Sequence, residues 1–346
     1  MPPAPTSGDR MTATRDPAPG RRGLFSSLDA RTAARLRSVA PVAVLVVLCL
    51  FISVVSPNFL TLNNIIRILN AAAIPMVIVM GATFVILMGS IDLSVEGVVS
   101  LSAVALAVLV LNDQTAYNLG LYALPVAVLL GGVLGFLNGV VHVRLKVPSF
   151  MATLGIGFAC LGVATAALGG FPVRIADPTI RQLAIGRSLG LPNGVWIATA
   201  AVAIAYLIQQ RTRIGRWMYA IGTDEATARQ CGVPVERTRI FIFTIAGLFY
   251  GLAGMMTLAQ LGQAHALVSQ GRLFTAITAV VVGGTALSGG VGSVLNSVIG
   301  VLIVIVLTNG MVLMGVPPYA QLGVQGLLII VAVALALDRS RLDVVK

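Results

Sequence analysis

Apolar residues along this chain occur in long runs separated by short polar segments, and this alternation repeats from Val39 to Leu337. A helix needs about 20 mostly apolar residues to cross the hydrocarbon core of a bilayer, which is about 30 Å thick. The pattern therefore predicts an all-α, polytopic membrane helix bundle of about ten transmembrane helices. The expected spans are 39–55, 72–89, 97–111, 121–141, 150–168, 194–210, 240–260, 274–288, 292–313 and 321–337.

The two ends of the chain lack this pattern. Residues 1–38 are rich in Pro, Gly, Ser and Arg without a hydrophobic period, so we expect a disordered, basic, cytoplasmic tail. A long basic segment of this kind fits a cleaved signal peptide poorly, and 39–55 is expected to remain as the first span. The predicted transmembrane domain is 39–337, and 338–346 form a cytoplasmic C-terminal tail.

Composition agrees with a lipid environment. The 346 residues are 57% hydrophobic and only 10% charged, whereas a soluble domain carries about a quarter charged residues. The net charge of +11 raises the question of a nucleic-acid partner. The basic residues, however, fall in short segments between apolar runs, which is typical of cytoplasmic loops, so no nucleic-acid partner is expected.

The same basic residues predict the orientation. With the N-terminus inside, 18 of the 23 Lys and Arg residues fall on the cytoplasmic side. The five that remain outside are Arg67, Arg174, Arg181, Arg187 and Arg272. Because basic residues are retained in cytoplasmic loops, the count favours N-in and C-in termini.

Glycines recur at the spacing of helix contacts, in Gly131, Gly135 and Gly139 and again in Gly247 and Gly251. Small residues four apart allow helix backbones to approach closely in lipid. We expect these glycines to pack helices together, and direct contact with a solute is the less favoured alternative.

The loop between the sixth and seventh spans, residues 211–239, is the longest charged segment after the N-terminal tail. We expect a short cytoplasmic helix from Asp224 to Cys231, capped by Thr223 and ended by Gly232 and Pro234. An ordinary surface helix is the alternative to a functional one.

The loop also resembles the coupling loop of sugar-type importer permeases of the ATP-binding-cassette (ABC) class. That pattern is G-R-x-x-Y-A-x-G, a short Glu-Ala-containing helix, then A-R-x-x-G-[IV], and 211–239 contains each part. In that family the short helix is held by the ATPase subunit and transmits its closure to the membrane helices. The resemblance implies that coupling residues are Gly222, Thr223, Asp224, Glu225, Ala226, Ala228, Arg229, Gly232 and Val233.

A second stretch, GSIDLSVEG, is similar to the family's G-x-I-D-L-S-V-G, with Glu96 where Gly is common. A charge at mid-bilayer costs about 2.5 to 3.5 kcal/mol, so Asp92 should face protein or water. If the stretch is helical, Asp92 and Glu96 share a face. The two carboxylates either line the pathway or a gate, or lie at the cytoplasmic membrane surface, hydrated or capping the next helix.

A third stretch, GGTALSGGVGS at 283–293, resembles the family's glycine-rich segment. Glycines this dense break a helix, so the segment is a tight turn or part of the pathway wall. A phosphate-binding loop needs Lys followed by Ser or Thr, and neither Lys146 nor Lys346 fits. ATP hydrolysis is therefore expected to belong to another chain.

Polar residues inside the predicted spans are candidates for solute contact, because hydroxyl and amide groups suit a polyol. Hydrogen bonds between helices would explain the same residues. Together with the Asp92 stretch, the candidates for the translocation pathway or gate are Asp92, Ser94, Glu96, Asn138, Gln260, Thr308 and Asn309.

The resemblance as a whole implies a non-enzymatic, multi-pass permease subunit in the inner (cytoplasmic) membrane, importing a monosaccharide or similar small polar solute. It implies a homodimer of permeases, two ATPase subunits that bind ATP and Mg, and a solute-binding protein. No cofactor, catalytic residue or metal site is expected in this chain.

Two other functions compete with this interpretation. A proton-coupled secondary transporter would use Asp92 and Glu96 as its relay. An integral-membrane enzyme would need clustered titratable groups, and the two histidines, His142 and His265, lie far apart in the sequence.

Overall fold

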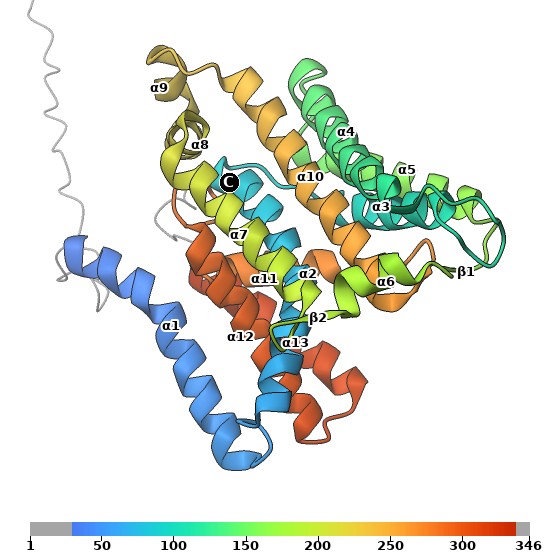
Figure 1. Cartoon of the computed structure of the whole chain (residues 1–346). Coiled ribbons are helices and arrows are strands. Elements are labelled where there is room, and N and C mark those ends of the chain that lie inside the picture. The colour runs from blue at the N-terminus through green and yellow to red at the C-terminus, as the bar shows by residue number, and fades with distance from the viewer. Residues whose placement is uncertain (1–29, 337–346) are drawn as a thin grey trace, which may run out of the picture.

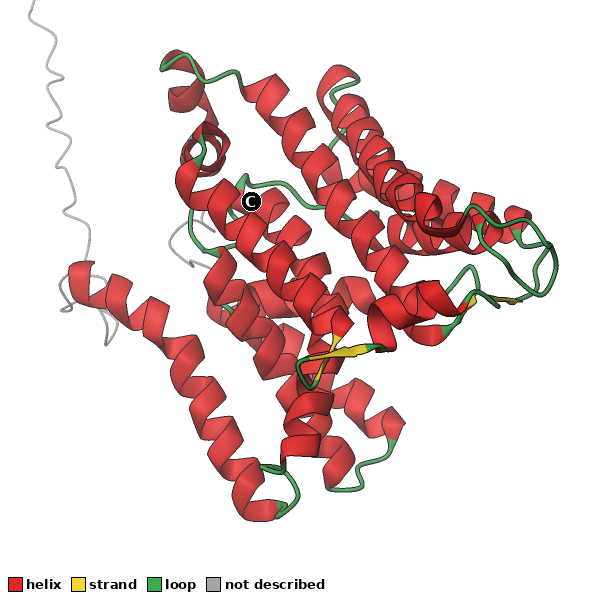
Figure 2. Ribbon diagram, viewed as in Figure 1, coloured by secondary structure: helices red, strands yellow, loops and turns green. Residues whose placement is uncertain are grey.

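The computed structural model describes residues 30–336, which form a bundle of helices with only very short strands (Figures 1 and 2). The predicted disordered tail before residue 30 and the predicted tail 338–346 lie outside the described residues. The helices are α1 (Ala30–Val55), α2 (Leu62–Leu87), α3 (Val95–Leu109), η1 (Gly120–Tyr122), α4 (Ala123–Arg144), α5 (Ser149–Ala167), α6 (Pro178–Ile185), α7 (Asn193–Arg211), α8 (Arg213–Thr223), α9 (Glu225–Gln230), α10 (Val235–Leu261), α11 (Arg272–Val282), α12 (Val294–Leu313) and α13 (Pro318–Ala336). The strands are β1 (Val173–Arg174), β2 (Arg187–Ser188), β3 (Leu191–Pro192) and β4 (Gln263–Ala264).

Each predicted span overlaps one of these helices, which confirms a helical, polytopic fold. Helices that are long and apolar enough to cross a membrane by themselves are Leu62–Leu87, Gly120–Arg144, Ser149–Ala167, Val235–Leu261 and Val294–Leu313. Shorter apolar helices are Val39–Val55, Val95–Leu109, Arg272–Val282 and Pro318–Val331. The number of ten crossings stays a prediction.

The first helix starts earlier than the sequence pattern suggested. α1 begins at Ala30, whereas the expected disordered tail extended to residue 38. The segment ARTAARLRS is rich in Ala, Leu and Arg, which are strong helix formers. Local helix propensity therefore extends the helix beyond the apolar run.

One of the expected spans is interrupted. α11 has 11 residues, so its length is about 16 Å, roughly half of the hydrocarbon core. It ends at Val282 because the glycine-rich segment 283–293 follows, and the prediction of a helix to residue 288 is wrong. The chain is also non-helical between α2 and α3, at 88–94, close to the predicted gap at 90–96, and α3 has 15 residues, as many as the predicted span 97–111.

Helix α10 lies at the centre of the bundle, packed along α4 and also against α3 and α2, while α1 stands at the periphery against α12 (Figure 1). The predicted glycine contacts are confirmed between α4 and α10. A Cβ on Gly135 would overlap the carbonyl oxygen of Phe243 and stand 2.9 Å from the Cα of Gly247. Only glycine permits the two backbones to approach this closely.

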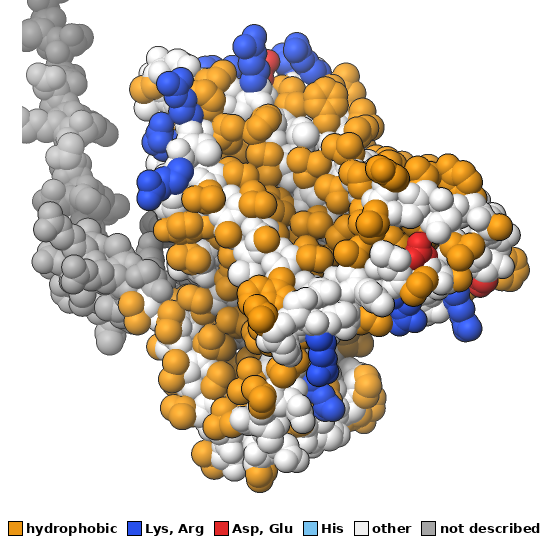
Figure 3. All heavy atoms as spheres, in the orientation of Figure 1, with side chains coloured by type: hydrophobic (Ala, Val, Ile, Leu, Met, Phe, Trp, Pro, Cys, Tyr) orange, Lys and Arg blue, Asp and Glu red, His pale blue; other side chains and the backbone are white. Residues whose placement is uncertain are grey.

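Connections that the N-in arrangement places on one side of the membrane contact one another. β1 pairs antiparallel with β4, and Asn112 forms a bridge with Ile175, so three connections expected outside meet. At the other end the amide of Gly290 donates to the carbonyl oxygen of Leu87, joining two connections expected inside. Lys and Arg side chains gather over the end that carries α8 and α9 (Figure 3). Which end faces the cytoplasm stays a prediction from the basic residues.

Candidate functional site

The predicted coupling loop forms two short helices joined by one residue. Asp224 lies between α8 and α9, and its carboxylate accepts hydrogen bonds from the amides of Ala226 (2.9 Å) and Thr227 (3.2 Å) and from the Thr227 hydroxyl (2.7 Å). Asp224 is therefore the N-cap of α9. The prediction that Thr223 caps this helix is wrong, because Thr223 ends α8 and its hydroxyl donates to the carbonyl oxygen of Tyr219.

Helix α9 ends as the sequence predicted, with a glycine in the left-handed region. Gly232 has φ +80°, and the amide of Val233 donates to the carbonyl oxygen of Ala228 at 3.1 Å. A glycine in this conformation commonly ends a helix, because the amides that follow it can donate to carbonyl groups of the last turn. Ala228 is buried against the protein, while Ala226 and Arg229 are exposed. Helix α9 thus projects from one end of the molecule with one face free (Figure 1).

Ion pairs hold α9 against the start of α10. Glu225 binds Arg229 at 3.0 Å within α9 and Arg239 of α10 at 2.7 Å. Partial burial opposes ionisation of Glu225, but the hydrogen bonds and charges of Arg229 and Arg239 outweigh it and lower the pKa of this carboxyl. The hydrogen bonds from Thr227 and Ala226 lower the pKa of Asp224 as well. Both carboxylates are therefore ionised at neutral pH, which favours the start of a helix.

The glycine-rich segment 283–293 is a tight turn between α11 and α12, the first of its two predicted alternatives. The amide of Ala286 donates to the carbonyl oxygen of Val291 at 2.9 Å, which closes the turn on itself. Leu287, within this turn, also lines a cavity, so the turn contributes to an internal wall as well.

Asp92 and Glu96 do not share a helix face, because Asp92 lies in the non-helical segment 88–94. Asp92 is 6% exposed, so it is not hydrated at a surface. One carboxylate oxygen accepts hydrogen bonds from the amide (2.9 Å) and the hydroxyl (2.6 Å) of Ser94. Asn138 of α4 donates to the same hydroxyl at 2.7 Å, so Asp92, Ser94 and Asn138 form one buried group.

Three atoms around this group lack a hydrogen-bond partner in the described chain: Oδ2 of Asp92, Oδ1 of Asn138 and the hydroxyl of Tyr250. Tyr250, on α10, is fully buried and lies near Asp92. Tyr250 was not among the residues predicted from the sequence, although a tyrosine inside an apolar run is a signal, since a buried phenol usually has a polar partner.

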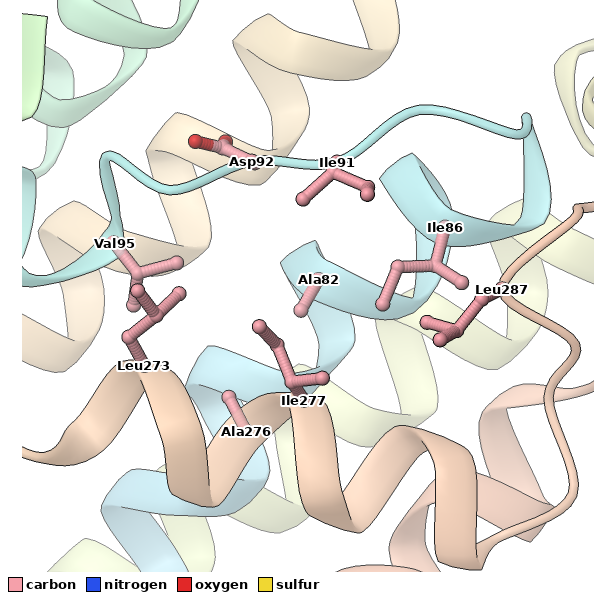
Figure 4. Close-up of a pocket in the computed structure, with 9 residues that line it drawn as sticks. All are labelled: Ala82, Ile86, Ile91, Asp92, Val95, Leu273, Ala276, Ile277 and Leu287. Carbon is pink, nitrogen blue, oxygen red and sulfur yellow. The ribbon is translucent and has the colours of Figure 1, made fainter. Parts of the chain in front are cut away.

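A cavity of about 110 Å³ lies between α2, the segment 88–94 and α11. Figure 4 shows Ile91, Leu273 and Ile277 converging on it, with the Asp92 carboxylate turned away. The wall is therefore apolar, and Asp92 shapes it by fixing the backbone of 88–94. The lining residues are Ala82, Ile86, Ile91, Asp92, Val95, Leu273, Ala276, Ile277 and Leu287.

Glu96 links the start of α3 to the start of α11. Its side chain accepts a hydrogen bond from the amide of Leu273 at 3.2 Å, and its carbonyl oxygen accepts one from the hydroxyl of Ser269 at 2.6 Å. The span prediction placed these two helix ends on opposite sides of the membrane. They meet because α11 is short and the preceding connection, with the buried residues Val268 and Ser269, folds back into the bundle.

The remaining pathway candidates lie near the ends of α10 and α12, and two of them, Thr308 and Asn309, are hydrogen-bonded to neighbouring helices. Asn309 exchanges two hydrogen bonds of 3.0 Å with Asn64 of α2, and Thr308 accepts one from Gln325 of α13 at 3.3 Å. Gln260 is half-buried in the last turn of α10. Among the described residues none of the three is hydrogen-bonded to the group of Asp92, Ser94 and Asn138.

Groups of His, Cys, Asp and Glu that could hold a metal ion are absent from residues 30–336. Cys49, Cys160 and Cys231 are free thiols.

The chain is similar in sequence to a family of transport proteins and to several of its members. A family model described as "Branched-chain amino acid transport system / permease component" matches residues 64–333. The ribose import permease protein of Escherichia coli K12 is 36% identical over 293 residues, covering 84% of this chain and 90% of the relative. The ribose import permease protein of Bacillus subtilis is 34% identical over 313 residues, 88% of this chain and 94% of the relative. The L-arabinose transport system permease protein of Escherichia coli K12 is 33% identical over 291 residues, 84% and 87%. No solved structure matches this chain.

Proposed function

The chain belongs to the permease-component family of branched-chain amino acid transport systems, and we propose that it carries a monosaccharide, of which ribose is the first candidate, across the cytoplasmic membrane. It is a multi-pass inner-membrane permease subunit of an ABC importer, a transporter rather than an enzyme. The choice of a sugar is supported by relatives named as ribose and arabinose permeases, which cover most of this chain.

The observation that carries the proposal is the construction of the 211–239 loop. Helix α9 projects from the bundle with a free face, Asp224 caps its first turn, and Glu225 is paired with Arg239 of α10. A rigid element between two membrane helices suits the transmission of motion from a soluble partner. We therefore propose that α9 is held by the ATPase subunit, with Ala226 and Arg229 on the contacting face and with Gly232 setting its end.

The transporter contains two copies of this chain, two ATPase subunits that bind ATP and Mg, and a solute-binding protein that delivers the sugar. The chain crosses the membrane ten times with both termini in the cytoplasm. This orientation puts the basic end that carries α8 and α9 where a cytoplasmic ATPase can reach it.

We propose that the solute pathway runs through the interior of the bundle around segment 88–94. Asp92, Ser94 and Asn138 position this segment, and Glu96, at the start of the following helix α3, is hydrogen-bonded to the start of α11. Non-helical backbone at membrane depth is tolerated where protein or a water-filled cavity surrounds it, which supports this placement. Gln260, Thr308 and Asn309 are candidates for solute contact nearer the helix ends.

Co-purification tests the proposal first. The tagged chain is extracted in detergent, and we expect a cassette ATPase to be recovered with it. The complex and its binding protein are then reconstituted into proteoliposomes, and uptake of radiolabelled ribose, arabinose, galactose and leucine is measured with and without ATP.

The expected result is ATP-dependent uptake of one sugar that an uncoupler leaves intact. A complex with an ATPase subunit that cannot hydrolyse ATP is the control, and it should give no uptake. Uptake by the chain alone, driven by a proton gradient, would refute the proposal in favour of a secondary transporter. ATP-dependent uptake of leucine alone would support the assignment as an ABC permease but refute a sugar as its solute.

A further inference from the structure

Three segments that are far apart in the sequence meet in backbone contact beside the coupling loop. They are the end of α2 (Leu87 to Gly89), the end of α8 (Gly222) and the turn 283–293. A Cβ on Gly222 would overlap the carbonyl oxygen of Leu87 and stand 2.5 Å from the amide nitrogen of Gly290. We call this contact the glycine junction.

Hydrogen bonds fix the junction from two sides. The amide of Gly290 donates to the carbonyl oxygen of Leu87 at 2.9 Å. The hydroxyl of Tyr219, on α8, donates to the carbonyl oxygen of Gly292 at 2.6 Å, and it accepts a hydrogen bond of 2.5 Å from Gln209 of α7. Gln209 is 3% exposed and also accepts from the amide of Val294 at 3.1 Å. The turn is therefore bound to α8 and α7 as well as to the end of α2.

The other side of the junction is the cavity wall. Ile86 and Ile91 come just before and just after the contact residues Leu87 to Gly89, and Leu287 lies within the turn. All three line the cavity of about 110 Å³ (Figure 4). Because the turn is closed by the hydrogen bond between Ala286 and Val291, a displacement at Gly290 moves Leu287 with it. Close-packed backbone transmits such a displacement, since no soft side chain lies between the segments.

We propose that Tyr219 and Gly222 are positioning residues that transmit motion of α9 through the glycine junction to an apolar gate formed by Ile91, Ile277 and Leu287. A constriction lined by apolar side chains excludes water and polar solutes until it widens. When the ATPase moves α9, α8 displaces the turn, and Leu287 moves relative to α11 and segment 88–94. The inference rests on the proposed function, because it needs an ATPase that acts on α9.

Two variants remove the link while leaving α9 unchanged. Tyr219→Phe deletes the hydroxyl that binds Gly292. Gly222→Ala inserts a methyl group between α8 and the turn, which must then separate. The matched controls are Tyr206→Phe, a half-exposed tyrosine on α7 with no side-chain hydrogen bond among the described residues, and Gly162→Ala, where a Cβ would meet no described atom within 4 Å.

The experiment uses the reconstituted complex with Cys49, Cys160 and Cys231 replaced by Ser and with Leu287→Cys as the probe. The rate at which a membrane-permeant maleimide modifies the introduced thiol is measured without nucleotide and with ATP plus vanadate. We expect nucleotide to change this rate by about fivefold or more. In Tyr219→Phe and Gly222→Ala the change should fall below about twofold while ATP hydrolysis continues, and uptake per ATP hydrolysed should drop in parallel.

If nucleotide leaves the labelling rate unchanged in the Leu287→Cys background, Leu287 is not part of a moving gate. If Tyr219→Phe leaves the nucleotide response unchanged, motion is not transmitted through Tyr219, and this holds even if Gly222→Ala fails to assemble. The two controls should behave like the parent complex. Failure of the proposed function appears separately, as the absence of a co-purifying ATPase or of ATP-dependent uptake in the unmodified complex.

Discussion

Gly131 and Gly247 lie against each other in mutual backbone contact, where α4 crosses α10. A Cβ on either residue would overlap the carbonyl oxygen of the other. This contact sets how closely α4 approaches the central helix of the bundle. Asn138 of α4 and Tyr250 of α10, one or two turns away, are thereby brought to the buried Asp92 group.

Replacing Gly247 by Ala should therefore destabilise the whole bundle. The added methyl group has no space unless α4 and α10 separate, and overpacking of this kind costs about 1 to 3 kcal/mol. Thermal unfolding of the detergent-purified chain, followed by intrinsic fluorescence, should show a lower midpoint than for the parent. Gly162→Ala is the control, and an equal shift in both variants would contradict the assigned contact.

Asp92 should tolerate Asn better than Ala. The amide oxygen of Asn can still accept the hydrogen bonds from the amide and hydroxyl of Ser94, whereas Ala leaves these buried donors unpaired, at a cost of about 1 to 3 kcal/mol. ATP-driven uptake by reconstituted variants is the measurement. If Asp92→Asn abolished uptake while the protein remained folded, the charge itself would be required, as a proton relay would demand.

Removing the N-cap of α9 should weaken the contact with the ATPase. Asp224→Ala deletes the acceptor for the first amides of the helix, while Asp224→Asn retains a good cap. The expected order of affinity for the ATPase, measured by titration of labelled subunits, is parent, then Asn, then Ala. Equal affinities for all three would show that the cap is dispensable.

The pH dependence of α9 follows from the same carboxylates. The pKa values of Asp224 and Glu225 are lower in the folded loop than in an unfolded chain. Their stabilising contribution is thus fully present above the unfolded pKa and is lost as the pH falls through the folded one. Affinity for the ATPase should therefore be constant near neutral pH and decline only in strongly acidic solution. A decline between pH 6 and 8 would implicate another group.

The ion pair between Glu225 and Arg239 should be testable by exchange of charges. Arg239→Glu alone places two acids together and should reduce coupled ATP hydrolysis. The double variant Glu225→Arg with Arg239→Glu should recover part of the loss, because the opposite charges meet again. The pair is partly exposed, so the recovered interaction is about 1 kcal/mol or less. Absence of any recovery would mean that Glu225 contacts the ATPase directly.

Asn309→Leu separates the two interpretations of the polar residues near the helix ends. The reciprocal hydrogen bonds with Asn64 predict lower stability, by about 0.6 kcal/mol per bond, with an unchanged KM for the sugar. Unfolding midpoints and uptake kinetics provide the two readouts. A large increase in KM without loss of stability would instead place Asn309 in the pathway.

The sequence by itself determined the features that are local along the chain. Apolar runs of membrane length located the helices, because hydropathy is a property of consecutive residues. The caps and breakers of α9 were also local, and Gly232 ended it as expected, although Asp224 rather than Thr223 became the cap because α8 continues through Thr223. The spacing of Gly131, Gly135 and Gly139 was sufficient to predict a close helix contact.

Only the tertiary structure decided which of these elements meet. Glycine lowers a hydropathy window only slightly, so the shortening of α11, which ends at Val282 rather than at residue 288, was hidden from the hydropathy pattern. The fold-back that brings Ser269 to Glu96 follows from that shortening. The meeting of Leu87, Gly222 and Gly290 joins segments more than sixty residues apart. Such a contact depends on how α2, α8 and the turn 283–293 pack together, which no single segment encodes.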